Sequence, residues 1–355
     1  GRLVARRASD EALLVDAVDV RGYAPLRTAL AEHLRVVRGV ACTADDLVIV
    51  ASVQQALDLV VRVTLDPGQQ VWLEDPGYGG ARAVFATHGA RIVRVPVDAD
   101  GLRVDLGVAR APHARLAYVT PGHQAPLGAT MAIARRTQLL AWARAERAVI
   151  VEDDYDSEYR YEGRPVPALQ GLDRAGVVVH LGTFSKTLLP SLRLAYAVVP
   201  RGLMAPVLAA LSVTARYTPP LLQAALADLI AEGHFARHLR RMRELYAGRR
   251  AALLHALEAQ LGYAIEVVGA SAGLDLAVRL PRAQRDTEVV RRLAAHRIEA
   301  TALSTLGDAN GLELGFAPYS EARLRAGVAI LREVLAAMPR ATGTAGRAAR
   351  ARAGR

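Results

Sequence analysis

Apolar and polar positions along the chain follow two alternating periods. Short apolar runs rich in β-branched residues predict seven strands, and apolar residues at helical spacing between them predict three helices. We expect the strands at 47–50, 70–74, 91–97, 115–120, 148–153, 177–182 and 192–200, and the helices at 54–65, 79–88 and 132–147. Strand–helix alternation is typical of an α/β fold, here with three layers in which helices cover both faces of a mainly parallel sheet.

The pattern changes after Pro219. Two helices are predicted at 219–231 and 235–258, and the remainder, about 262–338, has the pattern strand–strand–helix–strand–strand–helix. This order predicts a smaller C-terminal α+β domain. We therefore expect a truncated N-terminal segment, a large domain with its connecting helix, a small domain and a disordered basic tail, at 1–18, 19–258, 259–338 and 339–355.

The net charge of +10 comes from two segments. Residues 339–355 contain five arginines and no acid, and residues 235–250 contain six arginines and one glutamate. The rest of the chain is balanced, so the charge alone is a weak indication of nucleic-acid binding. We interpret the 235–250 charges as a solvated helix face and leave open a weak contact between the tail and nucleic acid.

Cysteine content and hydropathy indicate a cytoplasmic protein. Cys42 is the single cysteine, which excludes an intramolecular disulfide and fits a small buried side chain in a reducing compartment. The longest apolar runs are too short to cross a bilayer, and the N-terminus has no signal-peptide pattern. We expect no membrane partner.

Lys186 is the only lysine among the 45 Lys and Arg residues. A lysine ammonium can lose its proton in a protein, whereas a guanidinium cannot, and only a neutral amine attacks a carbonyl to form a Schiff base. Lys186 follows a predicted strand at its carboxyl end, with Thr183 and Ser185 beside it and Arg193 seven residues later. Hydroxyls and a guanidinium suit a phosphate group. On this residue alone, chance retention of a surface lysine stays open.

A second predicted strand ends at Asp153, and Tyr155 follows on the same face. A buried aspartate requires a cation or a strong donor, and the nitrogen of a pyridoxal ring is such a partner. Tyr155 could then bond the phenolic oxygen of the ring. The alternative for Asp153 is a helix cap or turn residue. We interpret Asp154, Asp156 and Glu158 as caps and solvated charges.

Two further strand ends carry residues that suit the same ligand. Tyr78 lies in a Pro-Gly turn that opens a helix, where its ring could stack on a planar group, although a turn tyrosine has the same pattern. The backbone amides of Ser52, Val53 and Gln54 open another helix and could hold a phosphate. Each signal is weak alone, but four on successive strand ends favour one site.

These residues and their surrounding motifs resemble a known family. The chain resembles the aminotransferase-like domain of MocR-type regulators of the GntR family, within fold type I of the pyridoxal-phosphate enzymes, from about residue 19 to 337. The most specific segments are EDDYDSEYRYEGRPVPALQ and GTFSK, and others are RGYAPLRTALAEHLRVVRGV, LDPGQQVWLEDPGYGGAR, VTPGHQAPLGATMAIARR and EGHFARHLRRMRELYAGRR.

The resemblance implies pyridoxal 5'-phosphate as the cofactor and assigns roles to the candidates. Lys186 would form the covalent link, Asp153 would pair with the ring nitrogen, Tyr155 would bond the phenolic oxygen and Tyr78 would stack on the ring. His123 or Gln124 would lie beside the ring. The phosphate ligands would be Thr183, Ser185, Arg193 and the amides of Ser52, Val53 and Gln54.

The resemblance also implies a homodimer, a small-molecule amine or amino acid as ligand, and DNA contact only through a winged-helix domain that these residues do not include. Three departures accompany it. Ser52 and Val53 replace Gly and Ser, Ala17 replaces a Tyr that reaches the neighbouring subunit, and Glu313 stands where an Arg binds substrate carboxylate; Arg82 or Arg216 could substitute. We expect a regulator's effector-sensing domain, with a free-standing aminotransferase as the alternative.

Overall fold

The computed structural model describes residues 1–11, 13, 19–164 and 166–338. The chain forms two compact units, Gly1–Ala247 with Gly269–Leu274, and Gly248–Val268 with the chain from Asp275 onward. The predictions for the tail 339–355 and for position 17 lie outside the described residues. No helix among the described residues is long and apolar enough to cross a membrane.

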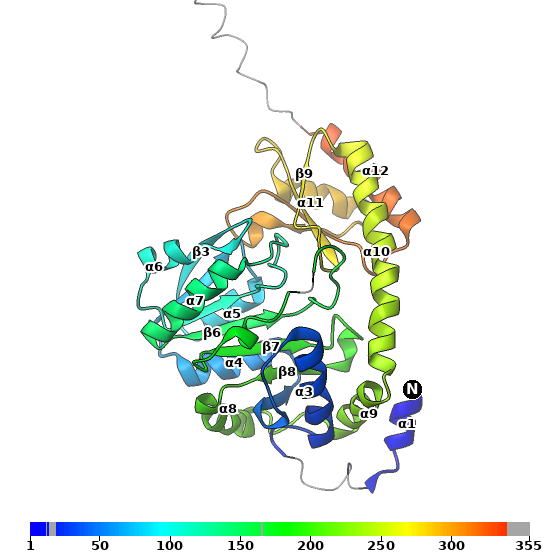
Figure 1. The fold of residues 1–355 in the computed structure, drawn as a ribbon. Helices are drawn as coiled ribbons and strands as arrows, with labels where there is room; N and C mark the ends of the chain where they lie inside the picture. The colour runs from blue at the N-terminus through cyan, green and yellow to red at the C-terminus, as the bar shows by residue number, and fades with distance from the viewer. Residues whose placement is uncertain (12, 14–18, 165, 339–355) are drawn as a thin grey trace, which may run out of the picture. The chain divides into compact units, whose positions relative to one another are not determined.

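An eight-stranded sheet forms the centre of the first unit (Figure 1). Its strand order is β1-β8-β7-β6-β5-β2-β3-β4. The pairs from β7 through β3 are parallel, whereas β8 runs antiparallel to β1 and β7, and β4 to β3. The strands are β1 (Leu47–Val50), β2 (Gln70–Asp75), β3 (Arg91–Asp98), β4 (Gly101–Leu102), β5 (Leu116–Val119), β6 (Val149–Asp154), β7 (Val178–Thr183) and β8 (Ala195–Val198).

Helices cover both faces of this sheet. One face packs against α4 (Val53–Thr64), α5 (Gly79–Thr87) and α8 (Arg201–Thr214), and the other against α6 (Val104–Arg110) and α7 (Ile133–Glu146) (Figure 1). Alternate strand residues feed the two cores, as strand geometry requires. Helices α1 (Arg2–Arg7), α3 (Ala24–Arg38) and α9 (Pro220–Ala231) complete the unit with the first half of α10 (His234–Leu261).

Strand direction gathers several loops at one edge of the sheet. Because β8 is antiparallel to both β1 and β7, those two strands point the same way as β6, β5 and β2. Their carboxyl ends therefore meet at one edge, and β8 begins at that edge. All the candidate segments predicted from the sequence follow these ends or precede β8, so the fold places them together.

The second unit contains a four-stranded antiparallel sheet, two further helices and the second half of α10. The sheet order is β11-β12-β10-β9. The elements are β9 (Glu266–Val268), β10 (Asp275–Arg279), α11 (Asp286–Ala295), β11 (Thr301–Ala302), β12 (Gly311–Gly315) and α12 (Glu321–Ala336). The predicted α/β class and the strand and helix pattern of both regions are confirmed. The sequence patterns did not predict α1, α3, α6, α8 or β4.

Candidate functional site

Asp153 is a buried carboxylate with one unpaired oxygen. It lies near the end of β6 and is 5% exposed. Tyr118 of β5 donates its hydroxyl to Asp153 Oδ2 at 2.5 Å, and Oδ1 is buried with no hydrogen-bond partner among the described residues. Burial raises the pKa of Asp153 to about 7, against the opposing hydrogen bond from Tyr118. An acceptor of this kind requires a donor or a cation.

The prediction that Asp154, Asp156 and Glu158 are caps and solvated charges is wrong for Asp154 and Asp156. Asp154 is buried, and both its oxygens accept bonds from Arg38, at 2.7 Å to Nε and 3.1 Å to Nη2. Asp156 is also buried, with both oxygens 3.1–3.2 Å from His123 Nδ1. Strand β6 extends one residue beyond the predicted end, to Asp154. Because side chains alternate along a strand, Asp154 points to the opposite face of the sheet from Asp153, where Arg38 at the end of α3 binds it.

Tyr78 and Gln54 meet at the sheet edge. Tyr78 caps the start of α5, is 37% exposed and lies with its ring centroid 6.3 Å from that of Tyr118, at an interplanar angle of 25°. A Cβ added at Gly80 would lie 2.3 Å from Gln54 Nε2 and 2.5 Å from the Tyr78 ring. Only glycine at position 80 allows these two side chains to lie where they do. Burial, with the charge of Asp153, raises the pKa of Tyr78.

The start of α4 presents backbone donors beside Gln54. Ser52 is the N-cap, and its Oγ accepts a bond from the Gln55 amide at 3.1 Å. The first-turn N–H groups of an α-helix, here those of Val53 and Gln54, have no intrahelical acceptor. A 12-residue helix adds its dipole, so this end can bind an anion. Ser52 in place of glycine is therefore accommodated as a cap.

Lys186 lies in the turn after β7 and is exposed. Tyr159 and His238 fix the backbone of this turn, with Tyr159 Oη 3.5 Å from the Lys186 carbonyl and His238 Nε2 3.0 Å from that of Thr187. Thr183 Oγ1 accepts a bond from the Ser185 amide at 3.1 Å. The backbone is therefore fixed while the lysine side chain reaches solvent.

Arg193 reaches the same edge from the other direction. Thr183 pairs with Ala195 across β7 and β8, so Arg193, two residues before Ala195, lies beside the end of β7. Arg193 is exposed and has a left-handed backbone conformation, with φ of 52°. Across β6 and β7, Asp153 is paired with Leu181, two residues before Thr183. Strand register therefore brings Asp153, Thr183 and Arg193 to one end of adjacent strands.

Tyr155 faces His123 and not Gln124. Tyr155 Oη lies 3.1 Å from His123 Nδ1. The His123 ring packs on Gly273, whose φ is 90° and where a Cβ would lie 2.1 Å from His123 Cε1. Gln124 is committed to its own loop: its amide nitrogen donates to the Pro76 carbonyl at 2.9 Å, and its oxygen accepts from the Leu127 amide at 2.9 Å. The polar side chain beside Tyr155 is therefore His123.

Two residues of the candidate site are not indicated by the sequence patterns. Tyr118 lies in the strand predicted at 115–120, and a hydroxyl on a fully buried strand requires a partner. Glu74, buried near the end of β2, accepts from the Thr120 hydroxyl at 2.7 Å and the Gln124 amide at 3.2 Å. Burial raises the pKa of Glu74 to about 7. Glu74 thereby holds together the loops that carry Tyr78 and His123.

The chain matches the family model for aminotransferase class I and II over residues 5–330. It belongs to this family. Among its relatives, it is 41% identical over 323 residues to the probable rhizopine catabolism regulatory protein MocR of Rhizobium meliloti, covering 90% of this chain and 65% of that protein. It is 32% identical to 2-aminoadipate transaminase of Thermus thermophilus, covering 86% of this chain and 78% of that protein.

Solved structures of the aminotransferase family confirm the fold. Kynurenine aminotransferase from Pyrococcus horikoshii superposes with a TM-score of 0.88 at 27% identity, covering 94% of this chain and 86% of that one. The α-aminoadipate aminotransferase LysN from Thermus thermophilus gives 0.86 at 30% identity, covering 94% and 87%. The expected resemblance to MocR-type regulators is likewise confirmed, and the chain spans 59–67% of the length of three regulators that it matches.

The departures from the family pattern lie in different places. Ala17 is outside the described residues. Glu313 is on β12 of the second unit, opposite Ala277 and Thr301. Of the suggested substitutes for a carboxylate-binding arginine, Arg82 is half-buried in the first turn of α5, and Arg216 is exposed after α8 with φ of 60°. The assignment of a substrate-binding arginine stays a prediction.

Proposed function

We propose that this chain is a pyridoxal-phosphate-binding domain that senses a small amine or amino acid and dimerises as part of a MocR-type transcription regulator. One observation carries the cofactor assignment: the unpaired, buried Oδ1 of Asp153 at the sheet edge where the only lysine emerges. Pyridoxal phosphate has a ring nitrogen that needs an acceptor, an aldehyde that needs an amine and a phosphate that needs an anion site. This edge of the sheet offers all three.

The residues present fit this cofactor. Asp153 Oδ1 would accept from the ring nitrogen, while the Tyr118 bond holds the carboxylate plane and occupies Oδ2. Tyr78 would cover one face of the ring, and Tyr155, steadied by His123, would bond its phenolic oxygen. The phosphate would bind the first amides of α4 with the hydroxyls of Thr183 and Ser185 and the guanidinium of Arg193. The relatives crystallised with pyridoxamine phosphate and a phosphopyridoxyl amino acid support this choice.

When bound, pyridoxal phosphate supplies an aldehyde that combines with amines and a ring that withdraws electrons. Lys186 Nζ would be its covalent partner in the resting protein and would hold or remove a proton at the carbon next to a ligand's nitrogen. Asp153 Oδ1 would accept a hydrogen bond from the ring nitrogen and so favour the form of the ring that withdraws electrons. Tyr118 would support this role, because its hydroxyl donates to the other carboxylate oxygen.

The relatives favour a sensory role. MocR of Rhizobium meliloti, TauR of Rhodobacter capsulatus and PdxR of Corynebacterium glutamicum are all named as regulators and are 35–41% identical to this chain. By this analogy, an amine that displaces Lys186 would change the domain and, through a winged-helix domain in the same polypeptide, DNA binding. We place the homodimer in the cytoplasm, with DNA contact confined to that second domain.

A free-standing aminotransferase is the second candidate. The set Lys186, Asp153, Tyr155 and Arg193 is sufficient for amino-group exchange, and two relatives at 30–32% identity are named as aminotransferases. Glu313, where the resemblance expects an arginine, opposes this candidate, because a carboxylate repels the carboxylate of an amino acid.

Incubation with the cofactor followed by a panel of amino acids and amines separates the candidates. A sensor binds the cofactor and responds to a ligand with a changed absorbance spectrum but releases no 2-oxo acid over many turnovers. Continuous 2-oxo acid production from any member of the panel would establish the enzyme and refute the purely sensory role. Failure of the wild-type protein to take up the cofactor would refute both.

A further inference from the structure

The second compact unit contains a pocket of about 460 Å³ that the proposed cofactor site does not use. It is lined only by residues of this unit, from α10, the end of α11, β12 and α12. Small-molecule sites in proteins have volumes of about 300–1,000 Å³ and combine apolar walls with a few polar groups. The pocket therefore has the size of a site for a small organic molecule.

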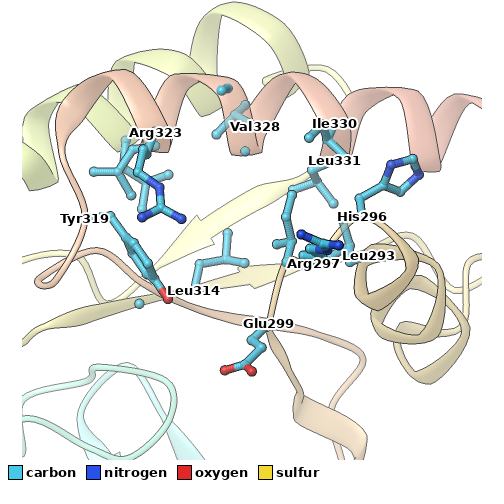
Figure 2. Close-up of a pocket in the computed structure, with 16 residues that line it drawn as sticks. Leu293, His296, Arg297, Glu299, Leu314, Tyr319, Arg323, Val328, Ile330 and Leu331 are labelled. Carbon is cyan, nitrogen blue, oxygen red and sulfur yellow. The ribbon is translucent and has the colours of Figure 1, made fainter.

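The walls are apolar, and the charged groups are two arginines and one glutamate. The apolar wall includes the buried side chains of Leu293, Val328 and Leu331, and Leu314 lies on the side of the pocket across from α12 (Figure 2). Such a surface removes an aliphatic or aromatic ligand body from water, at about 25 cal/mol per Å² of apolar area. The apolar wall favours a ligand with a hydrocarbon body.

Two guanidinium groups flank this surface. Figure 2 shows Arg323 of α12 and Arg297, just after α11, on opposite sides of Leu314. Arg323 lies with its Cζ 5.4 Å from the centroid of the Tyr319 ring, which fixes its position by a cation–π contact. Within the described chain, neither guanidinium forms an ion pair. Glu299 also lines the pocket, but its side chain points away from the two arginines in Figure 2.

We propose that this pocket binds a small organic anion, a carboxylate carried on an apolar body. The carboxylate would lie between Arg297 and Arg323, where guanidinium groups can bond both its oxygens. The apolar body would lie against Leu293, Val328 and Leu331. This proposal depends neither on the cofactor site nor on the proposed regulatory function.

Isothermal titration calorimetry of the purified chain with octanoate tests this site, with octylammonium as the oppositely charged probe. We expect octanoate to bind, octylammonium to give no measurable binding, and Arg323→Gln to weaken octanoate about tenfold, as expected for one lost charge-assisted bond. Arg325→Gln is the matched control, because it removes the same charge from the same helix outside the pocket. It should change the affinity less than twofold.

A second variant fills the pocket without disturbing its surroundings. Gly327 of α12 lines the pocket, and an added Cβ there meets no heavy atom within 4 Å. Gly327→Leu should abolish octanoate binding and leave the unfolding temperature unchanged or higher, since glycine weakens a helix interior. Equal binding of the two probes, unaltered binding to Gly327→Leu, or no binding of octanoate at all would each overturn the proposal.

Discussion

Three consecutive acids on β6 have different surroundings. Glu152 and Asp154 turn to one face of the sheet, and Asp153 turns to the other. Glu152 accepts from the Leu169 and Gln170 amides at 2.6 and 2.9 Å and pairs with His180, and Asp154 is held by two nitrogens of Arg38. Asp153 has one donor and one unpaired oxygen.

This difference separates structural carboxylates from a ligand-binding one. A buried carboxylate whose oxygens are all bonded contributes to the stability of the free protein. One with an unpaired oxygen costs stability until a ligand supplies the missing donor. We therefore expect substitutions around Glu152 and Asp154 to change mainly the stability of the protein. Substitution of Asp153 should change mainly the affinity for the ligand.

The largest effect should follow from breaking the Arg38–Asp154 pair. Arg38→Ala leaves Asp154 buried without its cation, so the free energy of unfolding should fall by about 3–5 kcal/mol in urea denaturation. Arg62→Ala is the control, because it breaks an exposed helix pair with Asp58 and should cost less than about 1 kcal/mol. Equal losses in both variants would remove the distinction between the two kinds of acid.

The pH dependence of stability should be next in size. The pKa of Asp153 is raised by burial from 3.8 to about 7 in the free protein. Between these values the folded state binds more protons at this position than the unfolded state, so stability should fall as pH rises from about 4 to 7 and then level off. At about 1.4 kcal/mol per pKa unit, the contribution is on the order of 4 kcal/mol.

Asp153→Asn isolates this contribution. The free energy of unfolding of the cofactor-free wild type and the variant is measured in urea at pH 5 and pH 8. It should decrease less between these two pH values in the variant than in the wild type. Glu74, whose pKa burial raises from 4.5 to about 7, adds a slope of the same sign and remains in the variant. Identical slopes in wild type and Asp153→Asn would show that Asp153 titrates normally.

Cofactor affinity should depend on the same side chain. Asp153→Asn removes the charge that would pair with the ring nitrogen, and we expect the dissociation constant for pyridoxal phosphate to rise about a hundredfold in an absorbance titration. Asp105→Asn, an exposed acid paired with Arg103, provides the control and should leave the affinity unchanged. An unaltered affinity in Asp153→Asn would contradict the assigned role.

The smallest effect should come from Tyr118. Tyr118→Phe removes the donor to Asp153 Oδ2 and should lower the unfolding free energy by about 1–2 kcal/mol. It should also move the pH at which Asp153 titrates upward, because the hydrogen bond lowers the pKa of that group. Tyr263→Phe, at an 80% exposed position, should do neither. A variant indistinguishable from this control would mean that the bond is not formed.

The sequence was sufficient for seven strands of the large sheet, for several of its helices and for the edge at which the candidates lie. The strands at 47–50 and 177–182 and their neighbours could be predicted because apolar β-branched runs have a clear period. The antiparallel direction of β8, which brings Arg193 back to that edge, could not, because it depends on pairing between β8, β1 and β7.

Side-chain partners were less predictable than elements. Asp154 meets Arg38 across 116 residues of chain, and no local pattern indicates that contact. The sequence also could not choose between His123 and Gln124, which are adjacent and both polar. The choice depends on the Glu74 and Pro76 contacts that hold Gln124 and on Gly273 beneath the His123 ring.

Reductive trapping gives the most direct test of the central claim, that Lys186 forms a covalent link to pyridoxal phosphate beside Asp153. Borohydride adds hydride to the carbon of a C=N bond and fixes the pyridoxyl group on the amine. Because Lys186 is the only lysine in the sequence, no other side chain offers a primary amine. Peptide mass spectrometry should find one pyridoxyl group, on Lys186, and none there in Lys186→Ala. An unlabelled protein, or a label confined to residues other than Lys186, would contradict this claim.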